Sequence, residues 1–356
     1  MTRIESEPPI KTILVGVGSW GLDWASQVFP RVPDAELCAV VCRNPQKFET
    51  ISTSLDCSPF IIFASLEEAI AKTRASAVLI ATQTSGHAAI ATQALERGLN
   101  VLVEKPLTET LAEGASLVHL AKKMNRVLMV SQNYRFFPTA HLVARLVKEE
   151  CLGRLHRVIV DFRRNAPITD SSRAEWLAVQ PDPLLSDLGI HHFDLVRMVT
   201  GLEARTAYCL PSAPANSRFR DPSTASAIIA MDRGVAVSWT GSWENSGGKT
   251  TYSGDWRMEC ERGDIVWACR GDRDITLDHD RVSLHVNGQV DDLPLEKGGP
   301  FGRALGLQAF CNAIKSGAHD RLLPLGEDNI RSLALTHAVL KSARTGQVVQ
   351  VDHCDS

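Results

Sequence analysis

The stretch Lys11-Thr-Ile-Leu-Val-Gly-Val-Gly-Ser-Trp-Gly21 joins a short apolar run to the pattern G-x-G-x-x-G. Residues Ile13–Val17 have the length and β-branched content of a buried strand. The three glycines allow a tight turn, a close approach of backbone to a pyrophosphate, and close packing of the next helix. That helix would direct its free N–H groups and its dipole at the pyrophosphate. The residues predicted to contact a dinucleotide here are Gly16, Gly18, Ser19, Trp20 and Gly21.

Composition limits the classes of partner. The chain has 356 residues, enough for two domains, and its 44% apolar and 22% charged residues are typical of a soluble globular protein. A net charge of −3 without a basic block argues against nucleic acid or an anionic membrane as partner. No apolar run is long enough to cross a bilayer, and no signal peptide is evident. Nine cysteines without a C-x-x-C pair predict a reduced, cytoplasmic location.

Strand-like and helix-like segments alternate over the first third of the chain, which predicts a doubly wound parallel sheet of the α/β Rossmann type. The expected strands are Ile13–Val17, Leu37–Cys42, Phe60–Phe63, Ala77–Ala81, Val101–Val103 and Val127–Val130. Gly86–Arg97 and Glu109–Lys123 are expected helices, and Gly98 is an expected C-terminal cap. We assign residues 1–131 to this dinucleotide-binding domain.

After about residue 150, most strand-like segments follow one another without intervening helices. These segments are Arg157–Phe162, Ala204–Leu210, Ala225–Met231, Val235–Trp239, Lys249–Met258, Asp264–Ala268 and Val282–Val286. The expected helices are Leu188–Thr200, Arg303–Ser316 and Asp328–Arg344. Residues 132–356 are therefore predicted to form an α+β domain with a large, mostly antiparallel sheet. Helices would cover one face, and the other would pair with a second copy in a homodimer or homotetramer.

The end of the second strand bears on cofactor choice. In NAD-binding folds an acidic residue about 20 residues past the glycines binds the ribose diol. Here that position holds Cys42, followed by Arg43. A guanidinium can bind a 2′-phosphate through two hydrogen bonds, whereas a carboxylate would repel it. The sequence favours NADP(H), with NAD(H) as the alternative if Arg43 is only a solvated turn residue.

Two further segments contain residues suited to catalysis. Glu104-Lys105-Pro106 follows the fifth predicted strand, at the edge where open α/β sheets bind ligands. Asp187-Leu-Gly-Ile-His191-His192-Phe-Asp194 opens a predicted helix of the second domain. Asp187 and His191 are four residues apart, so they are expected on one face of that helix.

This combination resembles the Gfo/Idh/MocA family of oxidoreductases, which includes glucose–fructose oxidoreductase and inositol dehydrogenase. The resemblance extends over nearly the whole chain. It includes Ala81-Thr82 with His87 after the fourth strand, and Asn133-Tyr-Arg-Phe-Phe-Pro138 at the domain junction. Gln83 stands where most members have proline, a departure in the cofactor loop. The resemblance implies cofactor contacts from Thr82, His87, Glu104 and Lys105.

The resemblance also implies that Lys105, Asp187 and His191 are the catalytic residues. Oxidation of a secondary alcohol needs a base for the hydroxyl proton while hydride leaves for the nicotinamide. Histidine side chains ordinarily change charge near neutral pH, so His191 suits the role of the base. Lys105 would stabilise the developing alkoxide, and Asp187 would orient the substrate or His191.

Four other residues are predicted to contact the substrate, namely Tyr134, Arg135, Arg163 and His192. His192 points away from His191 on a helix and is expected to pack or to contact the rim of the substrate. Asp194 fits a structural hydrogen bond as well as it fits a ligand contact. Trp239, Trp243 and Trp256 fit either stacking on a sugar or, more simply, packing within the sheet. The adjacent histidines invite a metal site, but no second cluster of ligands supports one.

The predicted function is therefore hydride transfer between NAD(P) and a hydroxyl-bearing or carbonyl carbon of a sugar, inositol, polyol or related small molecule. Two alternatives stay open. One is a glycosidase of the same fold that oxidises its substrate transiently with a retained NAD. The other is a non-enzymatic regulator that senses dinucleotides, although retention of Lys105, Asp187 and His191 argues against it.

Overall fold

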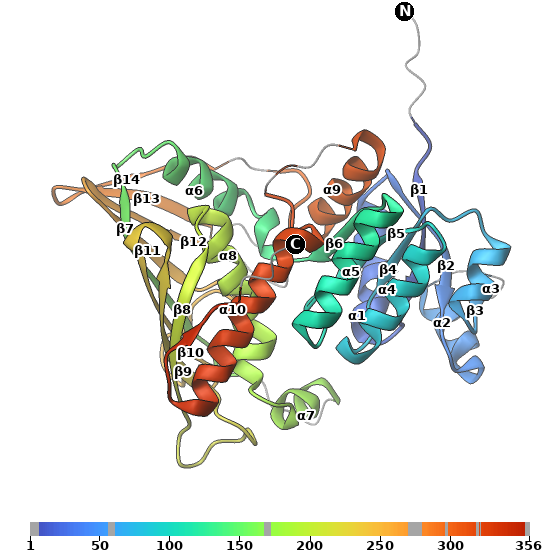
Figure 1. The fold of residues 1–356 in the computed structure, drawn as a ribbon, viewed down its shortest axis with the longest axis horizontal. Coiled ribbons are helices and arrows are strands. Elements are labelled where there is room, and N and C mark those ends of the chain that lie inside the picture. Colours follow the sequence, from blue (N-terminus) through green and yellow to red (C-terminus); the bar gives the residue numbers. More distant parts are fainter. Residues whose placement is uncertain are drawn as a thin grey trace, which may run out of the picture. The chain divides into compact units, whose positions relative to one another are not determined.

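The computed structural model describes residues 7–55, 61–166, 172–269, 280–295, 298–317, 320 and 322–352. The chain forms two compact units. The first contains residues up to Gln132 together with Arg303–Ile330, and the second contains Asn133–Gly302 and the segment from Arg331 onward. Each unit has its own sheet, and each is described separately below (Figure 1).

The first unit is built on a six-stranded sheet with the order β3-β2-β1-β4-β5-β6. Its strands are β1 (Ile10–Val15), β2 (Ala35–Val41), β3 (Ile62–Phe63), β4 (Ala77–Ile80), β5 (Asn100–Glu104) and β6 (Leu128–Ser131). All neighbouring strands are parallel, which confirms the predicted Rossmann architecture. The strand order reverses between β1 and β4, and ligands of such sheets bind beyond the carboxyl ends of the strands at this point.

The described part of the first unit contains six α-helices, and the ends of some of them show recognisable capping features. They are α1 (Ser19–Asp23), α2 (Phe48–Leu55), α3 (Leu66–Lys72), α4 (His87–Glu96), α5 (Leu111–Met124) and α9 (Gly302–Ser316), with a π-helical segment η1 (Trp24–Val28). Thr110 and Glu113 form a reciprocal capping box at the start of α5. Gly98 follows α4 with φ +76°, as expected for a C-terminal cap.

The domain assignment made from sequence differs from the structure in one respect. The boundary after Gln132 lies one residue from the predicted one, but Arg303–Ile330 belongs to the first unit. Two features hold this returning segment. Lys315 and Gln308 on α9 both bind Asp34, and the Val130 amide donates to the Pro324 carbonyl at 2.9 Å. These partners are far apart in sequence, so periodicity alone could not pair them.

The second unit contains a nine-stranded sheet with the order β14-β13-β12-β11-β7-β10-β9-β8-β15. Its strands are β7 (Leu155–Arg163), β8 (Ala204–Ser212), β9 (Thr224–Met231), β10 (Ala236–Ser242), β11 (Asp255–Cys260), β12 (Gly263–Ala268), β13 (Arg281–Val286), β14 (Gln289–Asp292) and β15 (Val349–Gln350). Among the described strands of this sheet, β7 and β10 alone pair in parallel, so the predicted mostly antiparallel sheet is confirmed. The strand expected from Lys249 begins instead at Asp255.

Helices lie on one side of this sheet. They are α6 (Pro138–Lys148), α8 (Ile190–Thr200) and α10 (Gly326–Thr345), and a further helix, α7, spans Ser172–Val179. Figure 1 shows α6, α8 and α10 on the same side of the strands. Burial alternates along the strands, as along β9, so one face is packed and the other exposed. Every residue of α8 from Ile190 to Val199 is buried, which makes it the central helix of the unit.

Candidate functional site

The three glycines after β1 are needed for different reasons. Gly16 has φ +101°, and a Cβ on it would lie 2.6 Å from the Ala81 carbonyl oxygen at the end of β4. A Cβ on Gly21 would lie 1.9 Å from the Gly16 carbonyl oxygen. Packing within the protein therefore requires both. Gly18 has an ordinary φ of −67°, and a Cβ on it would meet nothing within 4 Å.

Gly18 is the residue that leaves room for a ligand. It is the N-cap of α1, and no side chain caps the helix there. A bare backbone at a helix start beside the β1–β4 switch point suits the close approach of a pyrophosphate. The glycine turn thus fits a dinucleotide, and Ser19 and Trp20 form the first turn of the helix beside it.

Glu104, the last residue of β5, accepts two hydrogen bonds through its carboxylate. The Trp24 indole N–H donates to Glu104 Oε1 at 2.7 Å, and the Lys105 backbone N–H donates to Oε2 at 3.3 Å. Trp24 lies in η1, directly after α1. The glycine-turn helix is thereby connected to the backbone of Lys105. A cofactor contact was predicted for Glu104, but Trp24, 80 positions away, was not among the predicted site residues.

Arg303 on α9 was also missed. Its guanidinium carbon lies 4.2 Å from the centre of the Trp20 ring and 5.3 Å from that of Trp24, and the side chain pairs with Asp23. Such stacking of a guanidinium on aromatic rings holds the start of α9 against the glycine-turn helix. No local sequence signal links Arg303 to this helix.

His87 connects the ends of β4 and β5. Its Nδ1 lies 2.9 Å from the Pro106 carbonyl oxygen and its Nε2 lies 3.3 Å from that of Thr82. The ring is buried, and this burial lowers the pKa of His87 despite the two carbonyl groups. The ring lies between these two carbonyls and so connects the end of β4 to the turn that follows Lys105. Thr82 and Lys105 therefore lie at the carboxyl ends of adjacent strands.

Arg43 lies two residues beyond the end of β2 and is exposed. The position of the ribose-binding acid is occupied by the buried Cys42, whose amide donates to the Phe63 carbonyl at 2.9 Å. The exposed guanidinium therefore stands beside a strand end that offers no carboxylate of its own.

In the second unit, Asp187 and His191 lie on consecutive helical segments. Asp187 belongs to the π-helical segment η7 (Leu184–Gly189), which continues directly into α8 with His191. His191 is 9% exposed, and its ring stacks on that of Tyr134 with centroids 4.5 Å apart and planes at 20°. Asp187 is half-buried. The predicted cofactor residues Ser19, Trp20 and Gly21 lie in α1, directly before η1, and Asp187 lies within η7. Short π-helical segments frequently occur at functional sites.

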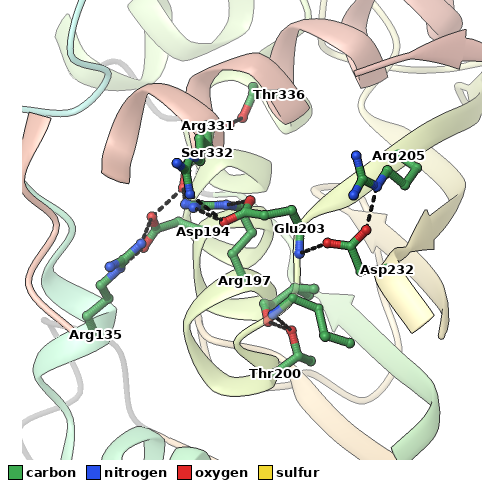
Figure 2. Close-up of polar contacts among 12 residues, drawn as sticks. Arg135, Asp194, Arg197, Thr200, Glu203, Arg205, Asp232, Arg331, Ser332 and Thr336 are labelled. Atoms are coloured by element: carbon green, nitrogen blue, oxygen red, sulfur yellow. Dashed lines mark hydrogen bonds and ion pairs between the residues drawn. The ribbon is translucent and has the colours of Figure 1, made fainter. Parts of the chain in front are cut away.

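Arg135 and Asp194 form a buried ion pair. Each is 1% exposed, and Arg135 donates to the two carboxylate oxygens at 2.6 and 2.7 Å. Asp194 also accepts a hydrogen bond from Ser332 (Figure 2). The prediction that Arg135 contacts substrate is not supported, because its guanidinium is engaged inside the protein. Asp194 has the structural role that the sequence left open.

His192 is fully buried among aromatic rings. Its Nδ1 accepts from the Trp239 indole N–H at 3.0 Å, and its Nε2 donates to the Tyr252 carbonyl at 2.9 Å. Burial lowers the pKa of His192 to about 4. These surroundings support the packing role rather than the predicted substrate contact. Trp239, Trp243 and Trp256 are likewise buried in the core.

Arg163 ends β7 on the exposed face of the nine-stranded sheet. Its guanidinium lies 2.8 Å from Asp161, and 3.8 Å from Asp255 on the neighbouring strand β11. The side chain is 42% exposed. Arg163 therefore takes part in a surface ion-pair ladder.

Comparison with known proteins establishes the family. A model described as an oxidoreductase family with an NAD-binding Rossmann fold matches residues 10–132, and a GFO/IDH/MocA C-terminal domain model matches residues 141–266. The chain belongs to the Gfo/Idh/MocA family of oxidoreductases. The family resemblance inferred from the two motifs is thereby confirmed.

Relatives of this oxidoreductase cover most of its length. The chain is 24% identical to protein y4oX of Sinorhizobium fredii over 96% of this chain and 95% of that protein. It is 27% identical to inositol 2-dehydrogenase of Corynebacterium glutamicum over 63% and 64% of the two chains. An oxidoreductase from Agrobacterium radiobacter, solved with NAD+, L-tartaric acid and magnesium, shares the fold with a TM-score of 0.82, at 18% identity over 96% and 98%.

Within the described ranges, this oxidoreductase has no group of three or more His, Cys, Asp or Glu side chains that could hold a metal ion. In the same part of the chain, no helix is both long and apolar enough to span a membrane.

Proposed function

We propose that this chain catalyses reversible hydride transfer between NAD(P) and the CH–OH carbon of a sugar, inositol, polyol or related small molecule. The observation that carries the proposal is the open backbone at Gly18, a glycine that internal packing does not require. Family membership and the retention of Lys105, Asp187 and His191 support it.

Each proposed catalytic residue has a chemical role in this reaction. The bound nicotinamide supplies the hydride acceptor. The imidazole of His191 accepts the hydroxyl proton, and the Lys105 ammonium stabilises the negative charge that develops on the oxygen. Asp187 orients the substrate hydroxyl or His191. In the reductive direction His191 or Lys105 donates the proton.

NADP(H) is the preferred cofactor in this proposal. Two features support this preference, the exposed Arg43 and the absence of a carboxylate at the end of β2. Replacing Arg43 with Ala is expected to raise the KM for NADP(H) far more than the KM for NAD(H). Equal effects on the two cofactors would remove the argument for this preference.

A panel of sugars, inositols and polyols, assayed by nicotinamide absorbance with both cofactors, tests the activity. We expect substrate-dependent cofactor reduction, and a loss of at least about 100-fold in kcat/KM for Lys105→Met with cofactor binding retained. Bond cleavage without net reduction would instead indicate the glycosidase. Cofactor binding without turnover on any compound would indicate the dinucleotide-sensing regulator.

The exposed face of the nine-stranded sheet is the proposed site of self-association. Tyr208 on β8 pairs in register with Ile228 on β9, and Leu210 lies two residues further along the same face. Their exposures of 37%, 53% and 60% leave an apolar patch on the strands. A second copy packed on this face would bury it and give a homodimer or homotetramer.

A further inference from the structure

Two adjacent residues of the 3-10 segment η6 (Asn133–Phe136) contact α8 separately. The Tyr134 ring stacks on His191, and the Arg135 guanidinium binds Asp194 through two hydrogen bonds. His191 and Asp194 are three residues apart and therefore lie on the same side of α8. The dipeptide thus holds this helix at two points, one of which is the proposed catalytic side chain.

The second contact, between Arg135 and Asp194, belongs to a buried network of hydrogen bonds. Ser332 on α10 donates to Asp194 Oδ1 at 2.6 Å, and Arg197 donates to the Ser332 hydroxyl at 2.6 Å. Arg197 in turn binds both carboxylate oxygens of Glu203, at 2.7 and 2.8 Å (Figure 2). Movement of Asp194 would leave a buried guanidinium without its partner, which is strongly unfavourable. The network therefore defines the position of α8 relative to η6.

The first point restrains the imidazole itself. The nearly parallel stack covers one face of the His191 ring, so rotation about its Cβ–Cγ bond would drive the ring into Tyr134. The imidazole plane is consequently held in one orientation. Proton transfer depends steeply on such orientation, because small displacements of a catalytic group lower the rate considerably.

We propose that Tyr134 and Arg135 are positioning residues for His191. Tyr134 acts on the imidazole plane, and Arg135 acts through Asp194 on the helix that carries His191. The proposal rests on the proposed catalytic role of His191. It replaces the expectation from sequence that these two side chains contact the substrate.

The test combines kinetics with NMR of the protein carrying ¹³Cε1-labelled histidine, in which His191→Gln identifies the His191 signal. In Tyr134→Leu, loss of the ring current is expected to move that signal downfield. We expect kcat to fall about tenfold, while the Kd for the cofactor, measured by calorimetry, stays unchanged. Tyr134→Phe keeps an aromatic ring and is expected to restore the signal position and most of the lost kcat.

A matched pair of arginine variants tests the second point. Arg135 and Arg205 each pair with a carboxylate, but the Arg205 side chain is 58% exposed in its pair with Asp232. Arg135→Met is expected to lower the Tm and shift the His191 signal, whereas Arg205→Met should change neither. If Arg135→Met does not fold, the Tyr134 variants test the positioning of the ring by themselves.

The outcomes separate this proposal from the proposed function. An unchanged His191 signal in Tyr134→Leu overturns the stack, and a shifted signal with unchanged kcat overturns its catalytic use. A folded Arg135→Met protein with an unshifted His191 signal overturns the role of Arg135. Full activity of His191→Gln would instead contradict the proposed function. The NMR comparison would still report whether Tyr134 and Arg135 fix the orientation of the His191 ring.

Discussion

At the residue scale, the glycine turn separates positions that serve the fold from one that serves a ligand. Gly21 is closed in by the Gly16 carbonyl, whereas Gly18 faces open space. The G-x-G-x-x-G pattern predicts different roles for these glycines, and the structure shows the packing that separates them. The proposed cofactor site can therefore be tested by measuring the free energy of unfolding and the cofactor Kd of variants at Gly18 and Gly21.

The two alanine variants are expected to behave oppositely. Gly21→Ala should lower the free energy of unfolding by about 3 kcal/mol, because backbone must move to admit the methyl group. Gly18→Ala should leave the unfolding free energy nearly unchanged but raise the Kd for NAD(P) about tenfold, or about 1.4 kcal/mol. Denaturant titration and calorimetry measure the two quantities. Normal cofactor affinity in Gly18→Ala would contradict the assigned pyrophosphate position.

Burial of His192 makes stability depend on pH. Its pKa is lowered to about 4 in the folded protein, against 6.5 as its ordinary value. The unfolded chain therefore binds the proton first, and the contribution is complete above pH 6.5 and lost as the pH falls toward 4. The loss over this window is roughly 3 kcal/mol.

Unfolding by denaturant at several pH values, followed by tryptophan fluorescence, measures this dependence. His192→Gln is expected to be less stable at pH 7 but to have a shallower slope below pH 6.5. Part of the slope should remain, since burial also lowers the pKa of His87 and His337. The exposed His119 provides a matched control as His119→Gln. An unaltered slope in His192→Gln would show that another group is responsible.

At the element scale, a short π-helical segment adjoins an α-helix in both regions that contain predicted site residues, the glycine turn and the helix of His191. The segment η1 brings Trp24 to Glu104, and η7 carries Asp187 into the helix of His191. Sequence periodicity predicted helices in both places but not this local geometry, because π-turns have no simple residue pattern. In contrast, the start of α5 follows directly from its sequence, since Thr110 and Glu113 cap it reciprocally.

The capping box of α5 should have a measurable energy. The Thr110 hydroxyl accepts from the Glu113 amide at 3.2 Å, and Glu113 Oε2 accepts from the Thr110 amide at 3.1 Å. Thr110→Ala is expected to lower the unfolding free energy by about 1 kcal/mol. Thr53→Ala, at an exposed position within α2, should cost little or nothing. A neutral Thr110→Ala would mean that α5 is held by packing alone.

At the scale of the whole molecule, the alternation of buried and exposed residues on the nine-stranded sheet leaves an apolar patch of Tyr208, Leu210 and Ile228. Ile228→Lys is expected to convert the proposed homo-oligomer to smaller species in light scattering after size exclusion, because a buried ammonium would lack a partner. Val179→Lys, on the exposed surface of α7, should not change the mass. A wild-type protein that is monomeric at micromolar concentration would contradict the association.

Much of this architecture was predictable from the sequence alone. Parallel strands in the first unit, the mostly antiparallel sheet of the second and the family followed from periodicity, glycine spacing and two short motifs, because these signals are local. Gly98 at the end of α4, with a φ of 76°, follows from the same kind of local rule.

Only the tertiary structure decided how distant residues are used. It turned Arg135 and His192 inward, to Asp194 and Trp239, and it returned Arg303–Ile330 to the first unit. A charged or polar side chain in a sequence gives no sign of whether its partner is solvent, a ligand or another buried group. That partner is set by which distant segments pack together, and such packing depends on the whole chain rather than on any short pattern within it.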